Sequence, residues 1–175
     1  MTLRIGILTI SDRSARGERL DLSGPALAEA IRAQGWQVSS QAVIPDDAPT
    51  ISRTLIDWVG GGMLDILLTT GGTGFAPRDV TPEATQQVIE RPAPGLAEAM
   101  RQASLQQTPH AMLSRAIAGI RGNTLIINLP GSPKAAIENL NVLLPVLPHA
   151  VELLQEDPKA EAGHHLDARN ENDGP

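Results

Sequence analysis

The chain contains 175 residues, carries a formal net charge of −6 and has no cysteine. This length fits one domain that buries its own hydrophobic core, and the acidic balance argues against nonspecific nucleic-acid binding, which depends on clustered Lys and Arg side chains. The lack of cysteine excludes disulfides, thiolate metal sites and a cysteine nucleophile, and three aromatic residues are too few for a base-stacking surface.

The first predicted element is a strand over residues 3–10, which are aliphatic at nearly every position. Such a run is typical of a parallel strand buried on both faces, so we expect it inside a sheet. It is far too short for a signal sequence or a membrane span, which predicts a cytoplasmic protein without membrane contact. Ser11 and Asp12 follow the strand, where loops of α/β sheets carry ligands, although a purely local Ser-Asp turn would give the same pattern.

Two helices and a strand are predicted next. The first helix begins at Ser23, which we interpret as its N-cap, and stops at Gly35. Residues 36–44 alternate between apolar and polar side chains, as expected of a strand near the sheet edge. Apolar side chains then recur at helical spacing from Ile51, so a second amphipathic helix is predicted to reach about Gly60.

Residues 64–70 form another apolar run, which is suited to a buried strand. A glycine-rich loop follows, made of Gly71, Gly72, Thr73 and Gly74. Residues without a Cβ allow positive φ and let several backbone N–H groups approach one anion, which predicts a phosphate-binding loop. An ordinary tight turn is the alternative, and the loop matches neither the dinucleotide-binding pattern nor the P-loop pattern.

A charged pair, Arg78 and Asp79, follows this loop closely. A helix is predicted to begin immediately afterwards, with Thr81 as its N-cap and Pro82 in its first turn, and to extend to Glu90. Strand, glycine loop, charged pair and helix start thus form one unit. In open α/β sheets a ligand binds at the carboxyl end of such a strand.

The C-terminal half contains a second helix and a third buried strand. We expect a linker over residues 91–94, a helix over residues 95–106 and a strand over residues 124–129. Residues 112–121 suit either a strand or a helix, and we interpret them as irregular structure beside the site. Residues 156–175 are predicted to form a polar, acidic C-terminal tail.

A second strand-to-helix loop is predicted at Pro130, Gly131 and Ser132. Ser132 suits the N-cap of a helix that has proline at its first position. The free N–H groups at such a helix start form an anion site, although an ordinary capped helix has the same sequence pattern. Prolines at positions 145 and 148 are expected to kink or split this helix.

The alternation of strands and helices predicts an α/β domain with three layers, an open and mostly parallel β-sheet with helices on both faces. Asp12, Asp46 and Asp79 are all predicted at strand ends, although Asp46 also suits a helix start. Carboxylates beside a phosphate loop are a usual way to hold Mg²⁺. This combination predicts phosphoryl or nucleotidyl transfer, which needs positioning and charge neutralisation more than a protein nucleophile.

Four segments of the chain carry a specific pattern: TTGGTGFAPRDVTPEAT at 69–85, IERPAPGL at 89–96, LSRAIAGIRGNTLIINLPGSP at 113–133 and IPDD at 44–47. Together they resemble the molybdopterin adenylyltransferase family. That family comprises single-domain bacterial proteins of molybdenum-cofactor synthesis, a plant enzyme domain and the G domain of gephyrin. The resemblance implies one domain over residues 1–155 with the fold of molybdenum cofactor biosynthesis proteins.

By this resemblance, the protein would transfer AMP from ATP to the terminal phosphate of molybdopterin with Mg²⁺ and release pyrophosphate. Asp46 and Asp79 match the two aspartates that the family uses for Mg²⁺ and catalysis. The other implied site residues, which would bind substrate or nucleotide, are Ser11, Asp12, Gly71, Gly72, Thr73, Gly74, Arg78, Ser114, Arg115, Pro130, Gly131 and Ser132.

Family members are usually trimers and some are hexamers, so the resemblance implies a homotrimer that hands its product to a molybdenum insertase. A competing hypothesis is a noncatalytic molybdopterin-binding protein or scaffold of the same fold. A related bacterial branch has a divergent loop where this chain has residues 78–82, and that branch is considered poorly active. The presence of both Asp46 and Asp79 favours the enzyme.

Overall fold

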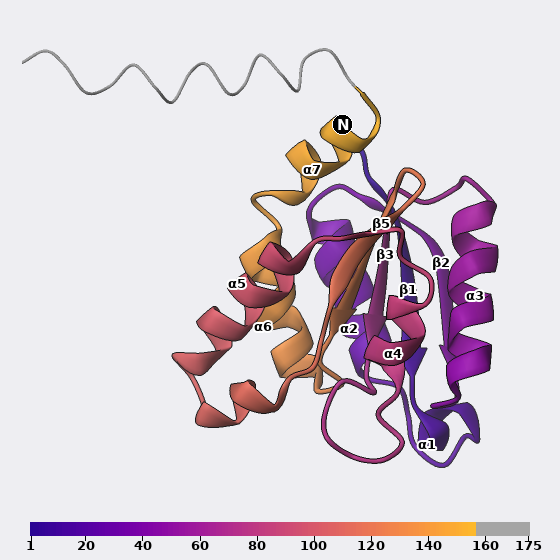
Figure 1. Cartoon of the computed structure of the whole chain (residues 1–175), viewed down its shortest axis with the longest axis vertical. Coiled ribbons are helices and arrows are strands. Elements are labelled where there is room, and N and C mark those ends of the chain that lie inside the picture. Colours follow the sequence, from indigo (N-terminus) through magenta and orange to yellow (C-terminus); the bar gives the residue numbers. More distant parts are fainter. Residues whose placement is uncertain (157–175) are drawn as a thin grey trace, which may run out of the picture.

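The computed structural model describes residues 1–156, which form a six-stranded sheet in the order β2-β1-β3-β6-β5-β4 (Figure 1). The strands are β1 (Arg4–Ile10), β2 (Gln37–Ile44), β3 (Ile66–Thr70), β4 (Arg91–Pro92), β5 (Ala118–Arg121) and β6 (Thr124–Leu129). The helices are α1 (Asp12–Ala15), α2 (Ser23–Ala33), α3 (Ala48–Gly60), α4 (Thr81–Gln86), α5 (Pro94–Leu105), the 3₁₀ helix η1 (Pro109–Leu113), α6 (Pro133–Leu143) and α7 (Leu147–Leu154).

Most of the sheet is parallel, as predicted. Strands β2, β1, β3 and β6 run parallel, whereas β5 pairs antiparallel with β6 and β4 pairs antiparallel with β5. The register places Thr9 opposite Thr70 and Thr70 opposite Leu129. The carboxyl ends of β1, β3 and β6 therefore lie level with one another, at the end of the sheet that we call its carboxyl edge.

Helices cover both faces of the sheet, which confirms the predicted three layers (Figure 1). Because successive side chains of a strand point to opposite faces, Leu68 packs into the core beneath α2, α5, α6 and α7, while Leu67 packs into the core beneath α3 and α4. Strands between two helical layers are near-continuous runs of apolar side chains. This burial explains the continuous aliphatic runs of β1, β3 and β6.

Two of the predicted N-caps are wrong. Ser23 is the first residue of α2, and the carboxylate of Asp21 accepts hydrogen bonds from the backbone N–H groups of Ser23 and Gly24 at 3.1 and 3.0 Å. Thr81 is the first residue of α4, and its hydroxyl donates to the carbonyl oxygen of Gly71 at 2.9 Å. Each residue is the first residue of its helix and not the N-cap, which is the residue before it. The side chain of a capping residue accepts from N–H groups two or three positions later, and neither hydroxyl does so here.

The segment after α4 also differs from the prediction. The helix ends at Gln86 rather than at Glu90, and part of the expected linker forms the short edge strand β4. The second half of the stretch predicted as irregular forms β5, which turns back onto β6 through Gly122 with a φ of +53°. Partners from the sheet stabilise these short strands, and local periodicity contains no information about such partners.

Other boundaries agree with the sequence. Ser132 caps α6 by accepting a hydrogen bond from the N–H of Ala135, and α6 and α7 are separate helices on either side of Pro145. Within residues 1–156, none of the helices combines the length and the apolar character that crossing a membrane requires. The predicted C-terminal tail, apart from Glu156, lies outside the described residues.

Candidate active site

The candidate site lies at the carboxyl edge of the sheet, where β3 continues into the glycine loop, residues 71–74. Gly71 has a φ of +106° and Gly72 a φ of +63°, both in the region that favours glycine. A Cβ on Gly71 would lie 2.2 Å from the carbonyl oxygen of Ile10. The close approach between the end of β1 and this loop therefore requires glycine at position 71.

The second strand-to-helix loop, residues 130–132, packs against the glycine loop. The N–H of Gly71 donates to the carbonyl of Leu129 at 3.2 Å, and a Cβ on Gly131 would lie 3.1 Å from the Cα of Gly71. We call residues 71–74 and 130–132 together the shelf. Because α6 begins directly after the shelf, the positive end of an 11-residue helix lies beside the glycine backbone.

A polar pocket of about 390 Å³ opens on one side of the shelf. The predicted site residues on its wall are Ser11, Asp46, Gly71, Gly72, Asp79, Gly131 and Ser132. Arg19 and Asp21 also line this pocket, although the sequence indicated only a polar loop around them. The structure thus brings together carboxylates and backbone from the ends of β1, β2 and β3.

Asp12 and Asp46 tie the ends of β1 and β2 together. The N–H of Asp12 donates to Asp46 Oδ2 at 2.7 Å, and the N–H of Asp46 donates to Asp12 Oδ1 at 3.1 Å. Hydrogen bonds from the Arg78 guanidinium, each 2.9 Å long, lower the pKa of the Asp12 carboxyl. Burial raises the pKa of the Asp46 carboxyl, and the nearby carboxylates of Asp12 and Asp79 act in the same direction.

Asp46 and Asp79, the two predicted metal ligands, both line the polar pocket. Within residues 1–156, no Lys, Arg or His forms a side-chain ion pair with either carboxylate, although both line the polar pocket. The described residues contain no group of three or more acidic, His or Cys side chains arranged to hold a metal. Two carboxylates beside a phosphate-binding backbone suit Mg²⁺, which keeps several waters and accepts phosphate oxygens as ligands.

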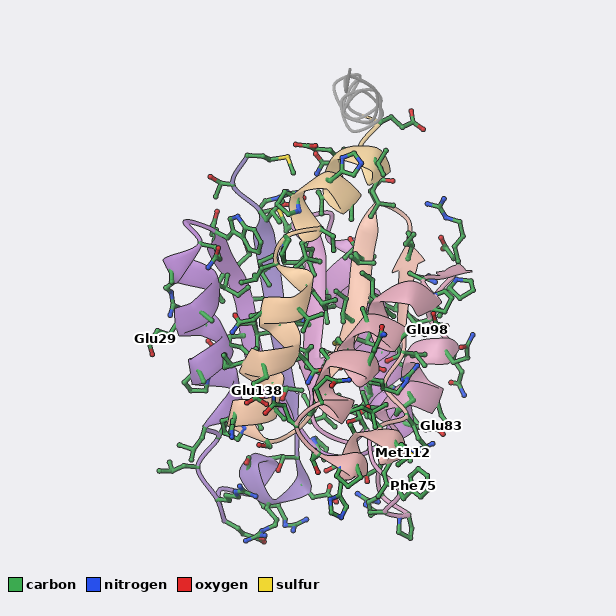
Figure 2. The ribbon with its side chains drawn as sticks, turned by 90° about the vertical axis from the view of Figure 1, so that its left-hand side faces the viewer. Glu29, Phe75, Glu83, Glu98, Met112 and Glu138 are labelled. Atoms are coloured by element: carbon green, nitrogen blue, oxygen red, sulfur yellow. The ribbon has the colours of Figure 1, made fainter. Side chains whose placement is uncertain are left out.

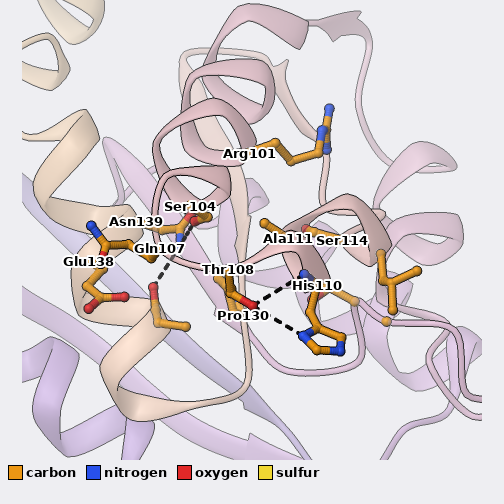
Figure 3. A pocket seen from close by; sticks show the side chains of 14 residues that line it. Arg101, Ser104, Gln107, Thr108, His110, Ala111, Ser114, Pro130, Glu138 and Asn139 are labelled. Carbon is orange, nitrogen blue, oxygen red and sulfur yellow. Dashed lines mark hydrogen bonds between the residues drawn. The ribbon is translucent and has the colours of Figure 1, made fainter.

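A second, less polar pocket of about 280 Å³ is lined by other residues of the shelf (Figure 3). The predicted residues Thr73, Gly74, Ser114 and Pro130 line it. The rest of its wall comes from α5, η1 and α6, and includes Arg101, Ser104, His110, Ala111, Leu113 and Asn139. None of these six was predicted from the sequence to belong to the site, because they meet only when α5, η1 and α6 pack together.

Polar side chains inside this second pocket are held by neighbours. The Asn139 side-chain amide donates to the Ser104 hydroxyl at 3.1 Å, and the Thr108 hydroxyl lies 3.2 Å from His110 Nδ1 (Figure 3). Arg101 donates to the carbonyl oxygen of Ala116 at 2.7 Å. The pocket therefore offers an apolar wall with a few oriented polar groups, as sites for flat organic rings commonly do.

Arg78 and Arg115, both predicted to bind substrate, have protein partners in the structure. Arg78 pairs with Asp12, while Arg115 contacts Gly74, Asp79 and Glu83. Neither arginine lines the polar pocket or the second pocket. The two arginines thus hold the segment around the glycine loop through contacts with the protein. The glycine loop itself contributes residues to both pockets.

The family model described as a probable molybdopterin binding domain matches residues 6–149. The chain is 46% identical over 166 residues to gephyrin from Dictyostelium discoideum, an alignment covering 89% of this chain. The chain spans only about a quarter of that relative's length, 23%. It is 42% identical over 155 residues to the molybdopterin adenylyltransferase of Helicobacter pylori, which covers 87% of this chain and 88% of the relative.

A solved structure shows the same fold over nearly the full domain. The molybdopterin biosynthesis enzyme MoaB from Thermus thermophilus superposes with a TM-score of 0.84 at 50% identity, and the match covers 90% of this chain and 99% of that one. The family model and the bacterial relative extend over both loops of the shelf and both pockets. The chain therefore belongs to the molybdopterin adenylyltransferase family of molybdopterin-binding domains, a family of nucleotidyltransferases.

Proposed function

We propose that this protein transfers AMP from ATP to the terminal phosphate of molybdopterin, with Mg²⁺, and releases pyrophosphate. The observation that carries the proposal is the shelf, whose glycine backbone separates a pocket with paired carboxylates from a pocket with apolar walls. The role in molybdenum cofactor biosynthesis follows from the family. The nucleotide, the metal and the released product are our inference from the chemistry of the two pockets.

Each pocket suits a different substrate. The triphosphate of ATP requires cationic or N–H partners and a metal, which the helix start at Ser132 and the carboxylates of Asp46 and Asp79 support on the polar side. The pterin of molybdopterin is a flat heterocycle that needs an apolar wall and a few hydrogen-bonding groups, such as Asn139 and Ser104. The phosphates of the two substrates would then meet at the shelf.

The proposed reaction is a direct displacement. An oxygen of the molybdopterin phosphate attacks the α-phosphorus of ATP, the bond from that phosphorus to the bridging oxygen breaks, and pyrophosphate leaves with the bonding electrons. Asp46 and Asp79 would hold Mg²⁺, which when bound neutralises part of the triphosphate charge. The backbone N–H groups of the shelf orient the phosphates, so positioning and charge neutralisation account for the catalysis.

Pyrophosphate release from purified protein supplied with ATP, Mg²⁺ and molybdopterin tests the proposal, with ATP alone as the blank. Asp79→Asn should keep the fold and pterin binding but lose at least about 100-fold in rate, since it removes a charge needed at the metal rather than a core contact. Asp57→Asn, an exposed change of the same kind on α3, is the matched control and should behave as wild type.

The outcomes separate two functions. Pterin-dependent release that disappears in Asp79→Asn supports the adenylyltransferase, and normal turnover in that variant would overturn the role given to Asp79. If Asp46 and Asp79 act on one ion, the double variant should lose less activity than the sum of the single losses. A wild-type protein that binds molybdopterin but releases no pyrophosphate would be the noncatalytic binding protein.

Three further properties are predictions from the family resemblance alone. They are a homotrimeric assembly, a cytoplasmic location and transfer of the adenylylated product to a molybdenum insertase. We expect light scattering of the purified protein to give three times the chain mass.

A further inference from the structure

Arg115 forms an unusual set of contacts with the segment that follows the glycine loop. Its Nε donates to the carbonyl oxygen of Gly74 at 2.7 Å, one terminal nitrogen donates to the carbonyl oxygen of Asp79, and the other pairs with the Glu83 carboxylate. Its backbone N–H also donates to the carbonyl of Thr73 at 2.9 Å. All three guanidinium nitrogens thus have protein acceptors, and Arg115 lines neither of the two pockets that flank the shelf.

The segment that Arg115 holds, residues 73–80, contains no helix or strand. Its tip is not held by apolar burial either, because Phe75 is 67% exposed (Figure 2), and within the segment the apolar contact with the core comes from Val80 at its end. Three other contacts stabilise its far end. They are the Arg78 pair with Asp12, a hydrogen bond from the N–H of Ala76 to Asp79 Oδ2 at 2.9 Å, and one from the N–H of Asp79 to the Ala76 carbonyl at 2.9 Å. Arg115 joins Gly74 to Asp79 through one rigid group.

We propose that Arg115 is a positioning residue for the transfer reaction, acting by fixing the distance between the glycine end of the shelf and the carboxylate of Asp79. This inference rests on the proposed function. Gly74 lines the less polar pocket and Asp79 lines the polar pocket. The guanidinium of Arg115 therefore connects one residue of each proposed substrate pocket without lining either pocket. A displaced Asp79 carboxylate would no longer be oriented for Mg²⁺ and the triphosphate.

The shape of the guanidinium is essential to this role. Its planar fork presents donors in three directions, whereas the ammonium of lysine is a compact charge that serves fewer fixed acceptors. Arg115→Lys should therefore keep the positive charge but release at least one of Gly74, Asp79 and Glu83. Because misplacing a catalytic group by about 1 Å can cost about 100-fold in rate, we expect kcat to fall by about 10- to 100-fold in Arg115→Lys and Arg115→Met.

Arg121 supplies the matched control. Its side chain is 32% exposed, against 33% for Arg115, and it also binds one carbonyl oxygen, that of Val88, and one glutamate, Glu90. It lies at the end of β5, outside both substrate pockets. Arg121→Met should therefore lose a similar amount of stability as Arg115→Met and keep the wild-type kcat.

The experiment measures kcat, the KM for ATP and molybdopterin, and the melting temperature for wild type, Arg115→Lys, Arg115→Met and Arg121→Met. A positioning role predicts that kcat falls in both Arg115 variants while KM changes less than about threefold. A KM increase with unchanged kcat would instead make Arg115 a substrate ligand and overturn the proposal. An equal kcat loss in Arg121→Met would mean that general destabilisation is responsible, which also overturns it.

Hydrogen exchange of the same four proteins gives a readout that does not depend on activity. In the Arg115 variants the amides of residues 73–80 should exchange at least about tenfold faster, while those of β3 and β6 stay as in wild type. Unchanged exchange in this segment would overturn the positioning role even if the rate fell. If wild type releases no pyrophosphate, the proposed function fails, and the exchange experiment still decides whether Arg115 holds the segment.

Discussion

At Gly71 the main chain has a φ of +106° and passes so close to the end of β1 that a Cβ would lie 2.2 Å from the carbonyl oxygen of Ile10. The positive φ and the close approach thus act on the same residue. Both arise where the parallel strands β1 and β3 end side by side at the shelf. The glycine at position 71, which we propose belongs to the phosphate-binding loop, is thus also the residue that allows the strand ends to meet.

Gly71→Ala should destabilise the protein by more than about 3 kcal/mol, because it adds a steric clash to the cost of about 1–2 kcal/mol for an L-residue in the left-handed region. Gly122→Ala is the control, since its φ is +53° but no atom lies within 4 Å of the added Cβ. Urea unfolding should show a loss of only about 1–2 kcal/mol there. Equal losses in the two variants would contradict the role of the close approach.

At the scale of elements, the strand ends and helix starts divide their tasks between neighbouring residues. Asp46 faces the polar pocket, while Asp47 caps α3 by accepting hydrogen bonds from the N–H and the hydroxyl of Thr50 at 3.0 and 2.6 Å. The sequence pattern left open whether Asp46 belonged to the site or to the helix start. The structure assigns the capping to Asp47, which leaves Asp46 available for the pocket.

The cap makes the stability of α3 depend on pH. Hydrogen bonds from Thr50 lower the pKa of Asp47 below its ordinary value of 3.8, so the folded state binds this proton less readily than the unfolded state. The stabilisation by the charged cap is complete above the unfolded pKa and is lost as the pH falls through the folded pKa. Asp47→Ala should therefore lower the melting temperature by a few degrees at pH 7 and by progressively less below about pH 4.

Asp47→Asn is the control for this cap, because asparagine is an equally good N-cap without a titrating charge. Thermal unfolding followed by circular dichroism between about pH 3 and pH 7 should show a nearly constant difference between Asp47→Asn and Asp47→Ala, because neither variant has a titrating group at this position, while both approach wild type as the pH falls. If Asp47→Ala and wild type differ by the same amount at every pH, the charge of the cap contributes nothing.

Across the whole molecule, the candidate site and the ion pair between Arg4 and Asp65 lie at opposite ends of the strands. Asp65, buried before β3 at the amino edge, accepts hydrogen bonds from the backbone N–H and the guanidinium of Arg4, both at 2.7 Å, and from the Gln155 side chain at 3.0 Å. These contacts join the starts of β1 and β3 to the end of α7 (Figure 1). No residue of the shelf takes part in them.

Asp65→Asn should lower the free energy of unfolding by about 1–3 kcal/mol, because one of its oxygens becomes an N–H donor facing the donors of Arg4 or Gln155. The rate of pyrophosphate release should stay within about twofold of wild type at temperatures where the variant is folded. Chemical denaturation and turnover measured on the same preparation check both statements. A tenfold loss of turnover without unfolding would mean that the two ends of the sheet are coupled.

The sequence alone determined the features that depend on local chemistry. Aliphatic runs predicted β1, β3 and β6 because strands buried on both faces are mostly apolar. Ser132 predicted the start of α6 because its hydroxyl can accept from the first N–H groups of a helix. The family motifs are equally local. They place glycines and carboxylates in loops directly after strands, so the three-layer sheet was predictable.

Only the tertiary structure decided which distant residues meet. Arg115 is separated from Gly74, Asp79 and Glu83 by 41, 36 and 32 positions, and no periodicity in the sequence couples them. The wall formed by α5, η1 and α6 and the pairing of β5 with β6 arise in the same way. Hydrophobic periodicity specifies which face of an element is buried, whereas the choice of its partner depends on packing and hydrogen bonding between segments that are remote along the chain.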